Sequence, residues 1–133
     1  MQTEYRQRRK AFMSKIGNGT AICHSAPIAV MHNDVEYAYR QDSDFFYLTG
    51  FNEPQAVAIL APHHSEHQFV LFVQPKERGK EVWSGYRCGV NAAREIYGAD
   101  AAYSIVELEE KLPYYLENAD RIYYRLGRDR LFN

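Results

Sequence analysis

A short histidine-rich segment holds the residues best suited to metal chemistry. His63, Glu66 and His67 fit the H-x-x-E-H pattern, in which two histidines bind zinc and a glutamate activates water. That chemistry needs a helix, because only a helix brings both histidines onto one face. Here Pro62 precedes the segment, and a run of β-branched and aromatic residues follows it. We therefore predict a hairpin turn and keep a zinc hydrolase only as an alternative.

A pair of carboxylates is the second candidate. Asp42 and Asp44 flank Ser43 and could present two carboxylates to a divalent cation, with Arg40 as an ion-pair partner of Asp44. Aspartate and serine are also favoured at the N-cap and in the first turn of any helix. Helix capping explains the same residues with fewer assumptions, so we expect the segment to begin a helix.

The remaining histidines and motifs predict no reaction. No Cys, Asp or Glu stands at ligand spacing from His24 or His32, so we assign neither of them a role. The sequence contains no G-x-G-x-x-G, P-loop or G-x-S-x-G motif. Nucleotide binding and serine hydrolysis therefore have no support.

Trp83 is the single tryptophan, and it lies in a polar, glycine-rich stretch, 81–89. A large ring in a loop often anchors an interface or lines a pocket. The same ring can instead cap the hydrophobic core, and the sequence does not separate these roles. Eleven tyrosines, including the pairs at 114–115 and 123–124, favour an interface in the same way.

The composition describes one soluble domain. Of 133 residues, 46% are hydrophobic and 25% are charged, and the formal net charge is −1. A chain of this length can bury a core without disulfides or metal. Because no apolar run approaches the ~18 residues of a membrane helix and the charge is balanced, we expect no membrane and no nucleic acid as partners. The basic residues of segment 6–10 are most simply the wet face of a helix.

The cysteines and the N-terminus indicate a compartment. Cys23 and Cys88 form no C-x-x-C pair, and no apolar stretch follows the basic N-terminus as in a secretory signal. We therefore expect reduced thiols in a cytoplasmic protein. A single disulfide between the two cysteines stays open as an alternative.

Capping residues and apolar spacing predict the helices. Thr3 can cap a first helix, which the glycines of segment 17–19 end. Its apolar stripe contains Tyr5, Phe12, Met13 and Ile16. Further helices are predicted from Asp42 or Ser43 to Gly50, over 90–97 with Gly98 as its end, and over 107–118 with Leu108, Leu112 and Leu116 on one face.

Short apolar runs predict strands over 20–25, 55–61, 67–73, 103–106 (an edge strand) and 121–126. The run 55–61 is apolar on both faces and bounded by prolines, as in a central strand that helices cover on both sides. The link between 55–61 and 67–73 is too short for a parallel crossover, so these strands form an antiparallel hairpin. The fold class is therefore α/β, with a mixed sheet and flanking helices.

The end of the sequence adds an expectation about the whole protein. The last predicted strand runs directly into segment 127–133, with no closing helix and no polar tail. This pattern resembles a cut at a domain boundary, so we expect a piece of a longer protein. A stop codon just after Asn133 would favour a free-standing module instead.

Three segments together resemble a known family. They are Tyr39–Pro54 (YRQDSDFFYLTGFNEP), Leu71–Pro75 (LFVQP) and Glu81–Gly85 (EVWSG), with Gly89 following. From about Arg8 to Leu126, the chain resembles the N-terminal domain of Xaa-Pro aminopeptidases, also called aminopeptidase P. The first segment is the most specific of the three.

The resemblance implies a domain of the creatinase N-terminal type over residues 1–133, followed by a separate "pita-bread" catalytic domain that is absent here. In the family, that domain binds two manganese ions through two Asp, one His and two Glu and removes the N-terminal residue ahead of proline. None of these ligands maps onto residues 1–133. The chain itself is therefore expected to be inactive and to hold no manganese, while its parent is a metalloaminopeptidase.

The resemblance also implies a supporting role. In bacterial members this domain builds the dimer or tetramer and helps wall the active-site entrance, where the tryptophan corresponding to Trp83 can reach a neighbouring subunit's site. The implied partners are the parent's catalytic domain, further copies of the chain and peptides with proline at the second position. A free-standing interaction or ligand-binding module of the same fold is the alternative. The sequence leaves open the preference for longer peptides or Xaa-Pro dipeptides, the oligomeric state, and the roles of Arg40 and Arg87.

Overall fold

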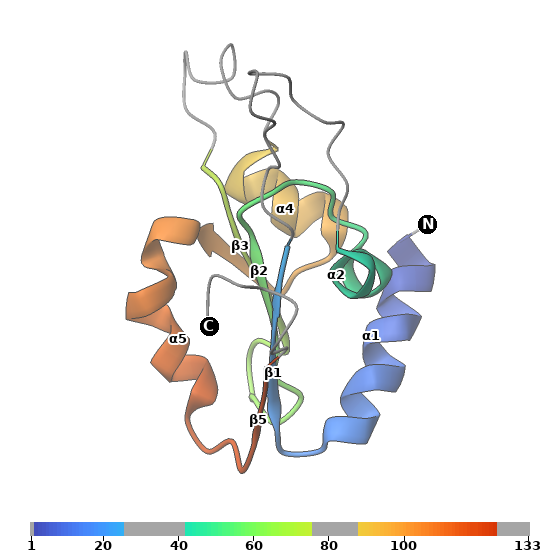
Figure 1. The fold of residues 1–133 in the computed structure, drawn as a ribbon, viewed down its shortest axis with the longest axis vertical. Helices are drawn as coiled ribbons and strands as arrows, with labels where there is room; N and C mark the ends of the chain where they lie inside the picture. Colours follow the sequence, from blue (N-terminus) through green and yellow to red (C-terminus); the bar gives the residue numbers. More distant parts are fainter. Residues whose placement is uncertain (1, 26–41, 76–87, 125–133) are drawn as a thin grey trace, which may run out of the picture.

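The structure is a computed structural model that describes residues 2–25, 42–75 and 88–124. Figure 1 shows a central sheet with α1 and α2 on one side and α5 on the other. The helices are α1 (Gln2–Ile16), α2 (Ser43–Thr49), α4 (Gly89–Tyr97) and α5 (Leu108–Leu116), with a 3₁₀ turn, η1, at Ile105–Glu107. The strands are β1 (Thr20–His24), β2 (Val57–Leu60), β3 (Phe69–Val73), β4 (Ala101–Ser104) and β5 (Ile122–Tyr124). None of the helices in the described ranges is long and apolar enough to cross a membrane.

The sheet mixes parallel and antiparallel strands in the order β4-β3-β2-β1-β5. β2 pairs antiparallel with both β1 and β3, while β4 runs parallel to β3 and β5 runs parallel to β1. In the β2–β3 hairpin, Ala58 lies opposite Leu71. The predicted α/β class, the mixed sheet and the antiparallel hairpin are therefore confirmed, as is the edge position of β4.

β2 is buried on both faces, as its continuous apolar sequence predicts. Ala58 and Leu60 point into a core that α1, α2 and α4 complete. Val57 and Ile59 point into a second core, which α5 covers. Full burial of each large aliphatic side chain contributes roughly 1.5–3 kcal/mol, so this central strand fixes the two-sided layering.

α1 packs against the sheet through the apolar side chains that the sequence predicts. Ile16 is buried, and Phe12 and Met13 pack against the same core. The helix already includes Gln2, so Thr3 lies inside it and the predicted N-cap is wrong. A shift of one or two residues in the start of a helix does not change which of its side chains face the core. The apolar residues of α1 therefore pack as predicted.

Arg9 overturns the expectation that the basic residues of α1 are all solvated. Its side chain is 4% exposed. The guanidinium donates to the Leu48 carbonyl oxygen at 3.0 Å and lies 4.0 Å from the centre of the Phe69 ring. Burial lowers the pKa of Arg9 to about 10, and the charge of Asp100 opposes this effect. Arg9 is therefore a charged residue at neutral pH that joins α1 to α2 and β3.

α2 begins and ends at the predicted residues. The Asp42 carboxylate accepts the Phe45 backbone N–H at 3.0 Å and caps the helix. Gly50 ends it in the left-handed region, with φ of 70°. A Cβ at this position would lie 2.7 Å from the Tyr5 ring, so Gly50 allows α2 to approach α1 closely. The predicted capping role of Asp42 is therefore confirmed.

The predicted strand 103–106 is wrong at both ends, because β4 begins at Ala101 and ends at Ser104. Ser104 leaves the sheet and caps η1, because its hydroxyl accepts the Val106 N–H while the Glu107 carboxylate accepts the Ser104 N–H. This capping box turns the chain, and Val106 becomes 81% exposed. The S-x-x-E spacing of residues 104–107 is a sequence signal for this turn.

α5 covers the second core with the predicted face. Leu108, Leu112 and Leu116 pack against that core, and Tyr115 is fully buried beside them. Tyr114 is 46% exposed. The tyrosine pair at 114–115 is therefore divided between core and surface, so an interface does not explain both rings.

Candidate functional site

The histidine-rich segment is a turn between β2 and β3, as predicted, and not a helix. His63 Nε2 lies 2.7 Å from Thr20 Oγ1. Because the Thr20 hydroxyl donates its proton to the Tyr115 carbonyl oxygen at 3.1 Å, it must accept from His63. His67 lies 3.0 Å, through Nδ1, from the Tyr115 hydroxyl. These histidines tie the turn to β1 and α5.

The His64 side chain makes hydrogen bonds with the backbone of the turn. Its Nδ1 atom accepts the backbone N–H groups of Glu66, at 3.2 Å, and of His67, at 3.0 Å. A nitrogen that accepts two hydrogen bonds must be unprotonated, so the folded turn requires neutral His64. Burial lowers the pKa of His64, and the neighbouring His67 acts in the same direction.

Tyrosines of α5 and β4 complete this network. The Tyr115 hydroxyl lies 3.0 Å from the Tyr103 hydroxyl, and burial raises the pKa of Tyr115. The Tyr114 hydroxyl donates to the Glu66 carboxylate at 2.6 Å, which lowers the pKa of Glu66 and raises that of Tyr114. The side chains of His63, Glu66 and His67 thus each have a structural partner.

The zinc alternative does not fit this geometry. Among the described residues, no three His, Cys, Asp or Glu side chains converge as a metal site would require. His63, Glu66 and His67 have separate partners in β1 and α5 instead. The side chains of the turn therefore contribute to the fold by their contacts with β1 and α5.

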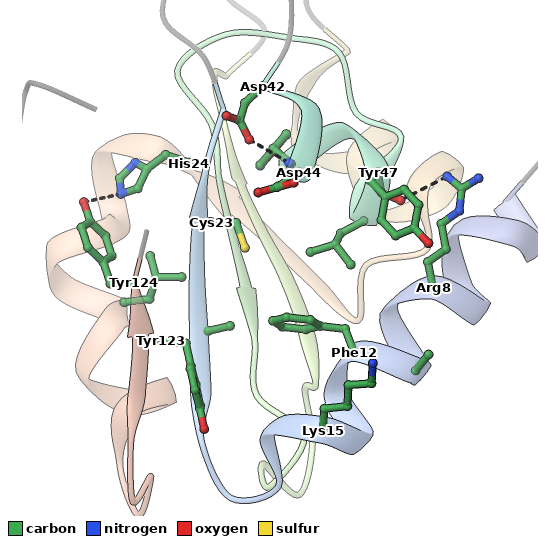
Figure 2. Close-up of a pocket in the computed structure, with 15 residues that line it drawn as sticks. Arg8, Phe12, Lys15, Cys23, His24, Asp42, Asp44, Tyr47, Tyr123 and Tyr124 are labelled. Carbon is green, nitrogen blue, oxygen red and sulfur yellow. Dashed lines mark hydrogen bonds between the residues drawn. The ribbon is translucent and has the colours of Figure 1, made fainter. Parts of the chain in front are cut away.

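A groove of about 620 Å³ lies between α1, α2 and the strands β1 and β5. Its wall is largely apolar, with Phe12 from α1 and Tyr123 from β5 on opposite sides (Figure 2). Arg8 lies at its margin, where it donates to the Tyr47 carbonyl oxygen at 3.3 Å and covers the Tyr47 ring. No sequence motif marks this groove, because its wall comes from segments distant in the chain.

Cys23 and His24 both line this groove but do not form a nucleophile and base. Neighbouring residues of a strand point to opposite faces of the sheet. His24 accordingly lies against Tyr124, with Nε2 2.9 Å from the tyrosine hydroxyl, while Cys23 packs toward the α1 side (Figure 2). Cys23 and Cys88 are both present as thiols.

The loop from α2 to β2 makes hydrogen bonds with residues that follow β1 and β3. Ser25, the last described residue after β1, exchanges two hydrogen bonds with Ala56, one between backbones at 2.9 Å and one to its hydroxyl at 2.7 Å. The Gln74 side chain, beyond β3, donates to the Pro54 carbonyl oxygen at 2.9 Å. These contacts gather the C-terminal ends of β1 and β3 at one end of the sheet.

Glu53 makes the third contact of the loop. Its carboxylate accepts the backbone N–H of Cys88, the residue that precedes α4, at 2.9 Å. Sequence reasoning missed Glu53 as an individual residue, although it lies inside the segment that carries the family resemblance. Trp83, the predicted entrance or interface residue, lies outside the described residues, as do His32, Arg40 and Arg87.

Comparison with known proteins decides the family. The model of the family described as "Aminopeptidase P, N-terminal domain" matches residues 5–123. The chain belongs to this family. The Xaa-Pro aminopeptidase of Escherichia coli is 38% identical over 126 residues, which are 93% of this chain and 29% of that protein. Human Xaa-Pro aminopeptidase 3 is 32% identical and is covered over 27% of its length, by 92% of this chain.

Solved structures agree with this assignment. The aminopeptidase PepP of Pseudomonas aeruginosa superposes with a TM-score of 0.93 at 44% identity, over 99% of this chain and 30% of that one. Aminopeptidase P from E. coli with the inhibitor Pro-Leu gives a TM-score of 0.90 at 35% identity, over 98% of this chain and 30% of that one. The resemblance and the fold type drawn from the sequence are confirmed. The chain spans less than a third of the length of these relatives.

Proposed function

We propose that this chain is the non-catalytic N-terminal domain of a Xaa-Pro aminopeptidase. The observation that carries the proposal is the match of an N-terminal domain family over nearly the whole chain, together with relatives named Xaa-Pro aminopeptidase that are more than three times as long. The parent releases the N-terminal residue that precedes proline, and its catalytic domain follows this one in the sequence.

The metal of the parent belongs to that further domain. One relative is a zinc-substituted aminopeptidase P, so metal chemistry fits the family, and we propose manganese as the parent's ion. The residues described here do not fit such an ion, because no three potential ligands converge. We therefore derive no catalytic step from this chain.

The chain supports catalysis by shaping the access of peptides and by joining copies of the parent. Trp83 is the residue that we assign to the active-site entrance or to the interface between copies. The contacts of Gln74 and Cys88 with the loop from α2 to β2 support this assignment, because these two residues lie on either side of the segment that contains Trp83. We propose the cytoplasm as the location, although one relative is a mitochondrial peptidase of Arabidopsis thaliana.

The experiment compares the parent enzyme with its Trp83→Ala variant on a peptide that begins Gly-Pro. We expect KM to rise about tenfold, as for the loss of a contact of about 1.4 kcal/mol, with a smaller change in kcat. Tyr114→Ala is the matched control, because it removes an exposed aromatic ring from α5. Equal KM values for the two variants would contradict the assignment. Light scattering of the parent tests the proposed homo-oligomer, and a fully active monomer would refute it.

A further inference from the structure

The groove between α1, α2, β1 and β5 reaches down to the hydrophobic core. Its lining includes Ala21, Phe45 and Leu48, which are buried in the core that α1, α2 and α4 complete. The rings of Phe12 and Tyr123 form opposite walls above them (Figure 2). The groove therefore offers a largely apolar surface to whatever binds there.

Two charged residues at the groove already have roles within the domain. Arg8 donates to the Tyr47 carbonyl oxygen and forms an ion pair with Glu4. The Asp42 carboxylate caps α2. A site for a small polar ligand needs polar groups that converge on the ligand. An apolar centre with a charged rim is instead typical of a contact between polypeptides, so a polypeptide fits this groove better.

The β5 wall of the groove is both fixed and exposed. A Cβ at Gly19 would lie 2.5 Å from the Tyr123 ring, so this ring rests directly on the Gly19 backbone. Tyr123 is nevertheless 37% exposed, and the adjacent Ile122 is 54% exposed. Both belong to β5, which lies at an edge of the sheet. Exposed apolar side chains on an edge strand favour contact with a further segment of polypeptide.

The parent polypeptide continues from this same edge. β5 is the last described element, and residues 125–133 can span at most about 30 Å. The parent segment that follows Asn133 therefore begins within reach of the groove. A short link gives such a segment an effective concentration in the millimolar range, which a second copy or another protein rarely reaches. The tethered segment is thus the favoured occupant.

We propose that the groove is the docking site of the parent segment that follows Asn133, with apolar side chains of that segment packed between Phe12 and Tyr123. This inference rests on the proposed function, since only a longer parent supplies the segment. Docking covers the exposed ring of Tyr123 and joins the domain to the rest of the parent at β5.

The experiment measures whether the groove is covered in the full parent. Lys15 lines the groove, whereas Lys10 of the same helix does not, and both lysines are exposed in this structure. The rate of maleimide labelling is measured for the Lys15→Cys and Lys10→Cys variants of the parent, folded and in urea. Peptide mass spectrometry separates the introduced cysteine from the natural ones.

We expect folding of the parent to slow the labelling of Lys15→Cys about tenfold, which corresponds to a segment that is docked about 90% of the time. Labelling of Lys10→Cys should slow by less than about twofold, because that position stays exposed. Equal slowing at the two positions overturns the proposal.

Residues 1–133 alone are the matched control for the parent. Because both lysines are exposed in this chain, we expect Lys15→Cys and Lys10→Cys to be labelled at equal rates. Slow labelling of Lys15→Cys that becomes faster when residues 1–133 are diluted would assign the groove to a second copy and overturn the proposal.

Photo-crosslinking from the groove identifies the occupant. The Tyr123→benzoylphenylalanine variant of the parent is irradiated as a mixture of isotopically light and heavy protein. We expect cross-links to the segment that follows Asn133, and only within light or within heavy molecules. Mixed light and heavy cross-links, or cross-links to another region of the parent, overturn the proposal.

Failure of the proposed function gives a different pattern. A parent that has no activity on Xaa-Pro peptides but protects Lys15→Cys keeps the docking site and loses the proposed function. A parent that is active but labels Lys15→Cys and Lys10→Cys equally keeps the proposed function and loses the docking site.

Discussion

Protonation of one histidine should loosen the turn between β2 and β3. His64 Nδ1 accepts two backbone N–H groups, and a proton on this atom removes both hydrogen bonds. Each net contribution is about 0.5–1.5 kcal/mol, so protonation should cost about 1–3 kcal/mol of the free energy of unfolding. For a chain of this length, that corresponds to a fall in Tm of about 3–10 °C.

The sign follows from the direction of the pKa shift. Burial lowers the pKa of His64 below its ordinary value of about 6.5, so the fold favours the neutral ring. The stabilisation is complete above that value and is lost as the pH falls through the lowered pKa. The groups that face His64 are His63, Glu66 and His67 of the turn, Tyr114 and Tyr115 of α5, and Glu117, which follows α5.

Urea unfolding between pH 8 and pH 5.5 measures how the free energy of unfolding depends on His64. In this range the carboxylates, with ordinary pKa values near 4, stay ionised. His64→Asn is the matched variant, because the Asn side-chain oxygen can accept the same two N–H groups in an Asx turn but does not titrate. We expect the pH dependence of the variant to be flatter than that of the wild type by up to about 1.4 kcal/mol, the limit that proton linkage sets at pH 5.5 for one histidine whose unfolded pKa is about 6.5. Equal slopes in the two proteins would refute the assignment to His64.

Three further changes test the packing of the helices. Arg9→Ala should lower the free energy of unfolding by about 2–4 kcal/mol, because it removes a buried guanidinium with its carbonyl and ring contacts, whereas Arg6→Ala on the solvated face should change it by less than about 0.5. Urea denaturation of both variants checks this, and equal losses would contradict it. Gly50→Ala should lower the free energy of unfolding by about 1–3 kcal/mol, since φ is positive and the new methyl group meets Tyr5. A variant with the Tm of the wild type would show that no such contact exists. Asp42→Ala should cost about 1 kcal/mol through loss of the α2 cap, read from the same curves, and Asp42→Asn should recover most of it if capping is the cause.

The parts of the fold that the sequence predicted are those marked by short sequence patterns, such as apolar runs and helix caps. β2 and β3 were predictable because continuous apolar runs bounded by proline are typical of central strands. α2 was predictable because Asp42 and Gly50 mark its two ends. The Ser104–Glu107 capping box carried an equally local signal, and its omission placed the edge strand two residues too far toward the C-terminus.

Long-range contacts explain what the sequence could not predict. Arg9 looks like a solvated residue among other basic residues, and only the approach of α2 and β3 supplies its partners. Glu53 and Cys88 are separated by 35 positions in the sequence, so no spacing rule identifies their hydrogen bond. The groove beside β5 likewise exists only once α1, α2 and the sheet have come together. The role of Trp83 stays a prediction.

Hydrolysis of a peptide that begins Gly-Pro tests the central claim most directly. Two proteins are compared at equal concentration and with added manganese, residues 1–133 alone and the full parent polypeptide. We predict turnover by the parent and none by residues 1–133, since the chain belongs to an N-terminal domain family and spans less than a third of its aminopeptidase relatives. Turnover by purified residues 1–133, or a parent with no activity on Xaa-Pro peptides, would contradict the account.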